Sequence, residues 1–220
     1  MNDLNLLQQA SIMALPLLFA ITLHEAAHGW AAARLGDNTA LMLGRVSLNP
    51  LRHIDPIGTV LLPLFMYFTT GFVFGWAKPV PVNWSRLGNP RRDTALVALA
   101  GPGANLLMML LWGLTARLAI HLHHLGMDWA AMPLIYMGGF GLMINAVLMV
   151  LNLFPLPPLD GGRVLVSLLP PRVAYRVAGI EPYGMMVLIL LLVTGVLWRL
   201  VGPFIDGSQQ LVAALLQTLF

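Results

Sequence analysis

Five long apolar stretches occupy most of this 220-residue chain and limit the folds open to it. They run over roughly 6–35, 57–76, 94–118, 129–154 and 183–201. A helix needs about 20 mostly apolar residues to cross the roughly 30 Å hydrocarbon core of a bilayer, and each stretch meets or nearly meets that length. Hydrophobic residues make up 58% of the chain and charged residues only 10%, too few to cover a water-exposed surface. We therefore expect an all-α polytopic membrane protein.

The composition excludes several other classes of protein. Gly and Pro show no triplet period, the chain is too apolar to be disordered, and it contains no cysteine, so collagen, disordered and disulfide-bonded scaffolds are ruled out. The net charge of +3 comes from scattered basic residues, and the longest basic cluster is Arg91-Arg92, so we expect no nucleic-acid partner. Without cysteine, any metal site must use histidine and carboxylate ligands.

The connectors between the apolar stretches are rich in Gly, Pro, Asn and Arg, and none is suited to separate a second domain. We therefore expect residues 1–220 to form one membrane domain, with its core motifs within 10–170 and an additional span at 183–202. In the first connector, residues 41–48 are expected to pair as a short membrane-associated β-hairpin. The tail at 208–220 repeats leucine at helical spacing, which favours an interfacial helix.

The first apolar stretch contains His24, Glu25 and His28 in the pattern H-E-x-x-H. At 3.6 residues per turn the two histidines share one helical face, where they can bind one metal ion, and Glu25 lies close to any water on that ion. Ionisable groups inside an apolar span are costly unless they are paired or coordinated. The pattern therefore indicates a zinc site. The alternative is a His-Glu pair that faces a neighbouring helix and is chemically inert.

A catalytic zinc ion has three protein ligands and a water, so a third ligand must come from elsewhere in the chain. Asp160 is the candidate, because it follows the fourth apolar stretch in NLFPLPPLDGG. There the prolines stop the helix, and Gly161-Gly162 permits the irregular backbone that can line a polar cavity at the edge of a span. A surface Asp160 that caps the next helix is the alternative. His53 stays open, since it can approach the site or pair with Asp55.

Three motifs in this order resemble the site-2 protease family of intramembrane zinc metalloproteases, in a small form without a PDZ or CBS domain. They are HEAAH in the first stretch, AGPGAN at 100–105 and NLFPLPPLDGG at 152–162. The resemblance covers roughly residues 10–170. It implies a multi-pass integral membrane protein in a prokaryotic inner membrane.

The resemblance also assigns roles to individual residues. It implies that one Zn²⁺ per chain is held by His24, His28 and Asp160 and that Glu25 is the catalytic acid and base. It further implies that two asparagines position the substrate or stabilise the reaction intermediate, although buried asparagines also bridge helices. These two are Asn105 and Asn152.

The three expected ligands can meet only if the first and fourth stretches run the same way across the bilayer. That requires residues 57–76 to re-enter on one side, which leaves about four transmembrane helices with the N-terminus outside. In that arrangement ten basic residues face the cytoplasm and two, Arg117 and Arg199, lie on or near the other side, as the positive-inside rule favours. The sequence alone leaves open whether residues 57–76 span or re-enter.

These features predict an intramembrane zinc-dependent endopeptidase. It would hydrolyse a peptide bond within or near the transmembrane segment of a membrane-protein substrate, with Glu25 as general base and acid for a zinc-activated water. The expected partners are that substrate and the lipid bilayer. A membrane metal-ion transporter and a non-catalytic pseudoprotease are the alternatives. The substrate, the cleavage site, the trigger and the oligomeric state do not follow from the sequence.

Overall fold

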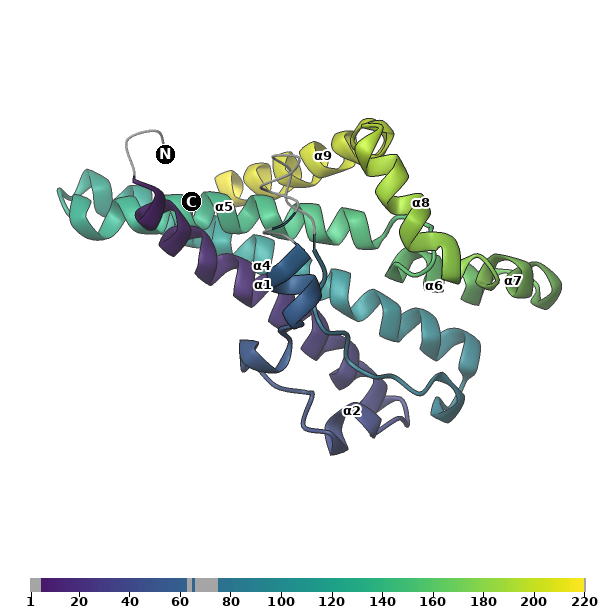
Figure 1. The fold of residues 1–220 in the computed structure, drawn as a ribbon. Helices are drawn as coiled ribbons and strands as arrows, with labels where there is room; N and C mark the ends of the chain where they lie inside the picture. The colour runs from purple at the N-terminus through teal and green to yellow at the C-terminus, as the bar shows by residue number, and fades with distance from the viewer. Residues whose placement is uncertain (1–4, 63–64, 66–74, 220) are drawn as a thin grey trace.

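The computed structural model describes residues 5–62, 65 and 75–219 (Figure 1). Three of its helices are long and apolar enough to cross a bilayer: α1 (Leu6–Arg34), α4 (Pro90–His124) and α5 (Asp128–Asn152). They correspond to the first, third and fourth apolar stretches of the sequence. The prediction of an all-helical fold with several spans is therefore confirmed for these three helices.

Helix α4 runs antiparallel to α1. Asn105, in the middle of α4, donates a hydrogen bond to the Ala20 carbonyl, whereas Val97, earlier in α4, contacts His28, later in α1. Figure 1 shows α5 returning alongside α4, so that α1 and α5 point in the same direction. This is the direction that the sequence analysis requires if the segment after α5 is to reach the histidines of α1.

Small residues let α4 and α5 pack closely. A Cβ atom on Gly138 of α5 would lie 2.6 Å from the Ala116 Cβ and 2.8 Å from the Trp112 carbonyl oxygen, both in α4. Close approach of this kind is how membrane helices gain packing energy, since lipid provides no hydrophobic drive for their association. The neighbouring Gly139 has no atom within 4 Å of its Cβ position and faces away from α4.

The last apolar stretch, where an additional span is expected at 183–202, is divided between two helices. Helix α8 (Glu181–Val193) ends before Gly195, whose φ of 72° is left-handed, and α9 (Val196–Leu219) then leaves in a new direction. The break lets α9 pack on α4 and α5, and its second half contains the tail expected to be interfacial. The α9 side chains buried in this packing are Leu197, Val201, Ile205, Val212 and Leu216.

Two short helices precede α8. Helix α6 (Asp160–Leu168) begins shortly after α5 and packs on α4, and α7 (Pro171–Ala178) follows it. Helices α7 and α8 meet at a bend of 61° and together have the length and apolarity of a broken span. The described residues thus contain three candidate spans, or four if this bent pair is one.

The expected β-hairpin at 41–48 is wrong. No strand occurs among the described residues, and α2 (Thr39–Met42) takes up the start of this segment. Asp37 accepts hydrogen bonds from the backbone N–H and hydroxyl of Thr39, and the Arg45 N–H closes a turn onto the Ala40 carbonyl. Gly44 then adopts a left-handed φ of 62°. These local hydrogen bonds favour a helical turn over the alternation of a strand.

The other described residues between α2 and α4 form short turns and one extended segment. The turns are η1 (Pro50–Arg52), η2 (Pro56–Leu61) and η3 (Trp84–Arg86). Between the last two turns, residues 76–83 have no helix, and we call them the strap. The strap is tied down where the Lys78 N–H donates to the His53 carbonyl and the Asn83 N–H donates to Asp37.

The two connectors that flank residues 57–76 lie at the same end of the α1–α4 pair. The Arg45 guanidinium donates to the Lys78 and Pro79 carbonyls, and the Gly88 N–H donates to the Leu35 carbonyl. This is the arrangement that re-entry of residues 57–76 requires. Most of that segment lies outside the described residues, so the re-entry itself stays a prediction.

Substitution of Gly138 tests the α4–α5 packing. We expect Gly138→Leu to lower the free energy of unfolding by about 1–3 kcal/mol, because the new side chain would overlap α4. Gly139→Leu, one position along the same helix, should leave stability close to that of the unmodified protein. Thermal unfolding of both variants in detergent checks this, and equal melting temperatures would contradict the packing described here.

Candidate metal centre

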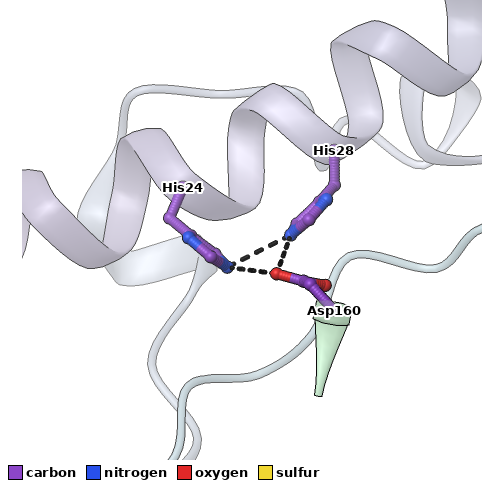
Figure 2. Close-up of side chains that lie close together, drawn as sticks. All are labelled: His24, His28 and Asp160. Atoms are coloured by element: carbon purple, nitrogen blue, oxygen red, sulfur yellow. Dashed lines mark hydrogen bonds and ion pairs between the residues drawn. The ribbon is translucent and has the colours of Figure 1, made fainter. Parts of the chain in front are cut away.

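Three side chains from two distant parts of the chain converge on one point (Figure 2). His24 and His28 project from the same face of α1, one turn apart, toward Asp160 at the start of α6. The Asp160 Oδ2 atom lies 3.3 Å from the Nε2 atom of each histidine. The two Nε2 atoms lie 3.1 Å from each other. The structure therefore brings together the three residues that the sequence analysis singles out as metal ligands.

The backbone around the site makes this convergence possible. Helix α5 ends at Asn152, and the proline-rich segment after it leads to α6. A Cβ on Gly161 would overlap the Leu153 carbonyl, so the first turn of α6 can sit on that segment only without a side chain there. Gly101 of α4 is equally restricted, since its Cβ would lie 2.6 Å from the His24 Cε1 atom. Glycines of two of the sequence motifs thus make room for the site.

The outer nitrogen of each imidazole already has a partner. His28 Nδ1 lies 2.8 Å from the Val97 carbonyl oxygen, and His24 Nδ1 lies 2.6 Å from the Asn105 Oδ1 atom. A carbonyl oxygen can only accept, so His28 Nδ1 carries a proton, and in the neutral imidazole Nε2 is then the nitrogen with the free lone pair. Partners of this kind fix the orientation and tautomer of metal-binding histidines.

The donor set fits a zinc ion. Zinc bonds to imidazole nitrogen and carboxylate oxygen are about 2.0–2.2 Å long, so a tetrahedral ion holds its ligand atoms about 3.3–3.5 Å apart. The separations of 3.1 and 3.3 Å among the three atoms come close to that spacing. Asp160 Oδ2 is buried without a hydrogen-bond donor. Among the described residues, His24, His28 and Asp160 form a group of three metal-ligating side chains that could hold one ion.

Glu25 lies beside the histidines and is held by the strap. Its Oε2 atom accepts a hydrogen bond of 2.8 Å from the Val80 backbone N–H. Val80 stands between Pro79 and Pro81, which have no N–H of their own, so its amide is the donor in this tripeptide. The prolines also favour an extended backbone at Val80. The strap therefore presents one backbone donor to the glutamate of the motif.

The two motif asparagines lie in different environments. Asn105 is fully buried, and its Nδ2 donates to the Ala20 carbonyl at 3.3 Å and to Asn145 Oδ1 at 2.9 Å, while its Oδ1 faces His24. Asn152 lies in the last turn of α5, where its Nδ2 donates to the Leu148 carbonyl of the same helix. The structure thus brings Asn105 into contact with a candidate ligand and leaves Asn152 bonded to its own helix.

Two of the other histidines, His53 and His123, are engaged elsewhere. His53 is buried with its Nε2 atom 2.9 Å from the Ser47 carbonyl, whereas Asp55 caps the turn that follows and accepts from the Ile57 and Gly58 N–H groups. The pairing of His53 with Asp55 is therefore not the arrangement adopted. At the far end of α4, His123 forms an ion pair of 2.6 Å with Asp128.

Sequence reasoning missed three groups that contact the site. Two are backbone groups, the Val97 carbonyl and the Val80 N–H, and no side-chain pattern reveals them. The third is Asn145, whose amide contacts Asn105. A signal for it did exist, because Asn145 is a polar residue inside the most apolar of the three spans.

Comparisons with known proteins agree with the site. The model of peptidase family M50 matches residues 116–194, which include Asp160. A Bacillus subtilis protein named "Putative zinc metalloprotease YwhC" is 36% identical over 94% of this chain and 93% of its own length. "Putative zinc metalloprotease Rip2" of Mycolicibacterium smegmatis is 32% identical over 87% of this chain and 71% of its own length. No solved structure matches this chain.

The similarity to the Bacillus relative extends along nearly the whole chain. The relatives' names and the family agree on a zinc cofactor, which is the ion that the two imidazoles and the carboxylate fit. The chain therefore belongs to peptidase family M50, the site-2 protease family of zinc metalloproteases.

Proposed function

We propose that this protein is an intramembrane endopeptidase that cleaves a membrane-protein substrate within or near its transmembrane segment. The observation that carries the proposal is the convergence of His24, His28 and Asp160 beside Glu25. Both histidines lie on an apolar helix that is long enough to span the bilayer. Because zinc and a metalloprotease family are established by similarity, the proposal concerns where the chemistry occurs and on what.

The proposed zinc ligands are His24, His28 and Asp160, one ion per chain. When bound, zinc lowers the pKa of a coordinated water to about 7 and polarises the substrate carbonyl. Glu25 takes the proton of the attacking water and later passes it to the leaving nitrogen, as a general base and then a general acid. The Val80 N–H keeps the Glu25 carboxylate in place during this transfer.

The two motif asparagines take different parts in the proposal. Asn105 orients His24, because its Nδ2 already donates to Ala20 and Asn145 and its Oδ1 faces the imidazole. Because these bonds already use the Asn105 amide, they argue against its expected role in stabilising the oxyanion of the reaction intermediate. Asn152 remains the candidate for holding the substrate backbone, since it lies just before the segment that carries Asp160.

The surroundings of the site suit an apolar substrate. A cavity of about 310 Å³ runs along the helix that carries the two histidines, lined almost entirely by apolar side chains from α1, residues 46–48 and Ala104. A transmembrane helix hides its amides in internal hydrogen bonds, so a substrate must unwind locally before its carbonyl is accessible. We propose that the cavity accepts a side chain of the unwound segment.

The proposed location is a prokaryotic inner membrane with the site in its cytoplasmic half. Both relatives described above are bacterial proteins. Ten basic residues belong to the end that contains the connectors and the start of α4, which the positive-inside rule puts in the cytoplasm. They are Arg34, Arg45, Arg52, Lys78, Arg86, Arg91, Arg92, Arg163, Arg172 and Arg176.

The first test replaces the proposed base. Glu25→Gln should retain zinc and lose about 10²- to 10⁴-fold in cleavage of a co-reconstituted single-span substrate, because the amide cannot accept the proton. Glu181→Gln, at the other glutamate of the chain, should cleave normally. Undiminished cleavage by Glu25→Gln would sink the proposed mechanism, and zinc movement across vesicles by that variant would favour a transporter.

The second test removes the proposed third ligand. Asp160→Asn should purify with a small fraction of one zinc per chain, because the neutral amide is a weak zinc ligand. Asp206→Asn, at an exposed acidic residue of α9, should keep the full content. Elemental analysis of the two purified variants decides, and full zinc occupancy in Asp160→Asn would remove Asp160 from the site.

A third test addresses the strap. Val80→Pro deletes the N–H that bonds Glu25 while keeping the extended backbone that the flanking prolines favour. We expect kcat to fall by about tenfold, the scale of a 1–1.5 kcal/mol hydrogen bond, with zinc content unchanged. Val80→Ala keeps the N–H and should retain kcat. Equal loss in both variants would show that packing, and not the amide, is what the strap supplies.

A further inference from the structure

Asn145 lies in the middle of α5, where a polar side chain is costly. Its side chain is fully buried, and α5 is the most apolar of the three candidate spans. The residue belongs to none of the three sequence motifs. A buried amide in such a span is expected to form hydrogen bonds with a definite partner. The contacts of Asn145 therefore indicate what it does.

The Asn145 amide joins a chain of hydrogen bonds that leads to a proposed zinc ligand. Its Nδ2 atom lies 2.8 Å from the Gly141 carbonyl oxygen, and its Oδ1 atom lies 2.9 Å from Asn105 Nδ2. Asn105 Oδ1 in turn lies 2.6 Å from His24 Nδ1. Both asparagines are fully buried, so the chain of bonds is closed to solvent.

The direction of every bond in this chain follows from its fixed end. The Gly141 carbonyl can only accept, so the Asn145 group that faces it must be the NH₂ and the group that faces Asn105 must be the oxygen. Asn105 must then turn its NH₂ to Asn145 and its own oxygen to His24. The proton of a neutral His24 must consequently be on Nδ1, which leaves Nε2 free to bind a metal.

The two histidines thus reach the same state by different routes. His28 donates directly to a backbone carbonyl, that of Val97. For His24 the nearest acceptor is a side-chain amide, which can rotate by 180° and offer a donor instead. The Ala20 carbonyl, at 3.3 Å from Asn105 Nδ2, supports the same orientation more weakly than Asn145 at 2.9 Å. His24 therefore depends on a second amide in a way that His28 does not.

We propose that Asn145 is a positioning residue that holds the Asn105 amide in one orientation and thereby keeps the His24 Nε2 atom unprotonated toward the zinc site. This proposal rests on the proposed function only for the identity of the ion. The state of the His24 ring belongs to the metal-free protein as well. Partners one step removed from a metal ligand affect metal affinity by about 10- to 100-fold.

Two substitutions separate the polarity of Asn145 from its volume. Asn145→Leu has the same number and branching of heavy atoms but no acceptor, whereas Asn145→Asp, as a neutral acid, keeps a hydroxyl that can donate to the Gly141 carbonyl and an oxygen that can accept from Asn105. Zinc affinity is measured for each purified protein in competition with a chelator. We expect Asn145→Leu to bind zinc about tenfold more weakly and Asn145→Asp to stay close to the unmodified protein. Equal weakening in both variants, or none in Asn145→Leu, would overturn the proposal.

The second measurement needs no metal. Nitrogen-15 NMR of histidine-labelled, metal-free protein at alkaline pH reports which ring nitrogen carries the proton. In the unmodified protein we expect the His24 ring to carry its proton on Nδ1. In Asn145→Leu we expect a mixture of rings with the proton on Nδ1 and rings with the proton on Nε2, whereas His28 should be unchanged and serves as an internal control. A His24 ring unaffected by Asn145→Leu would refute the positioning role. If the unmodified protein bound no zinc, the proposed function would fail, and the NMR result would still decide this inference.

Discussion

The Nε2 atoms of His24 and His28 face each other at 3.1 Å, and a carboxylate oxygen of Asp160 lies 3.3 Å from both. In an apolar environment this arrangement is repulsive unless positive charge lies among the three atoms. Zinc supplies that charge and has the bond lengths that match the spacing. Three features of the fold place these three atoms together. They are the parallel course of α1 and α5, the glycines around the histidines and the proline-rich segment that precedes Asp160.

Much of this could be predicted from the sequence, because membrane insertion and metal binding each leave a strong pattern. The three long spans follow from length and apolarity alone. The i, i+4 spacing of His24 and His28 fixes their common face. The need for a third ligand then sets the relative direction of the first and fourth apolar stretches, and the structure has that direction.

The parts that could not be predicted depend on local hydrogen bonds or on tertiary packing. Apolar composition at 41–48 suggested a hairpin, but Asp37 and Thr39 start a helical turn instead. The division of the stretch at 183–201 between α8 and α9 depends on packing, because the break at Gly195 allows one face of α9 to be buried against α4 and α5. The contacts of Asn105 could not be predicted either, since the motif gives no sign that its amide is occupied by Asn145.

Zinc-edge X-ray absorption spectroscopy of the purified protein in lipid tests the central claim most directly. The account predicts one zinc ion per chain, bound by two imidazole nitrogens and one or more oxygens at about 2.0–2.2 Å in a four-coordinate site. A protein that carries no zinc, or zinc surrounded only by water-like oxygens without imidazole scattering, would contradict it.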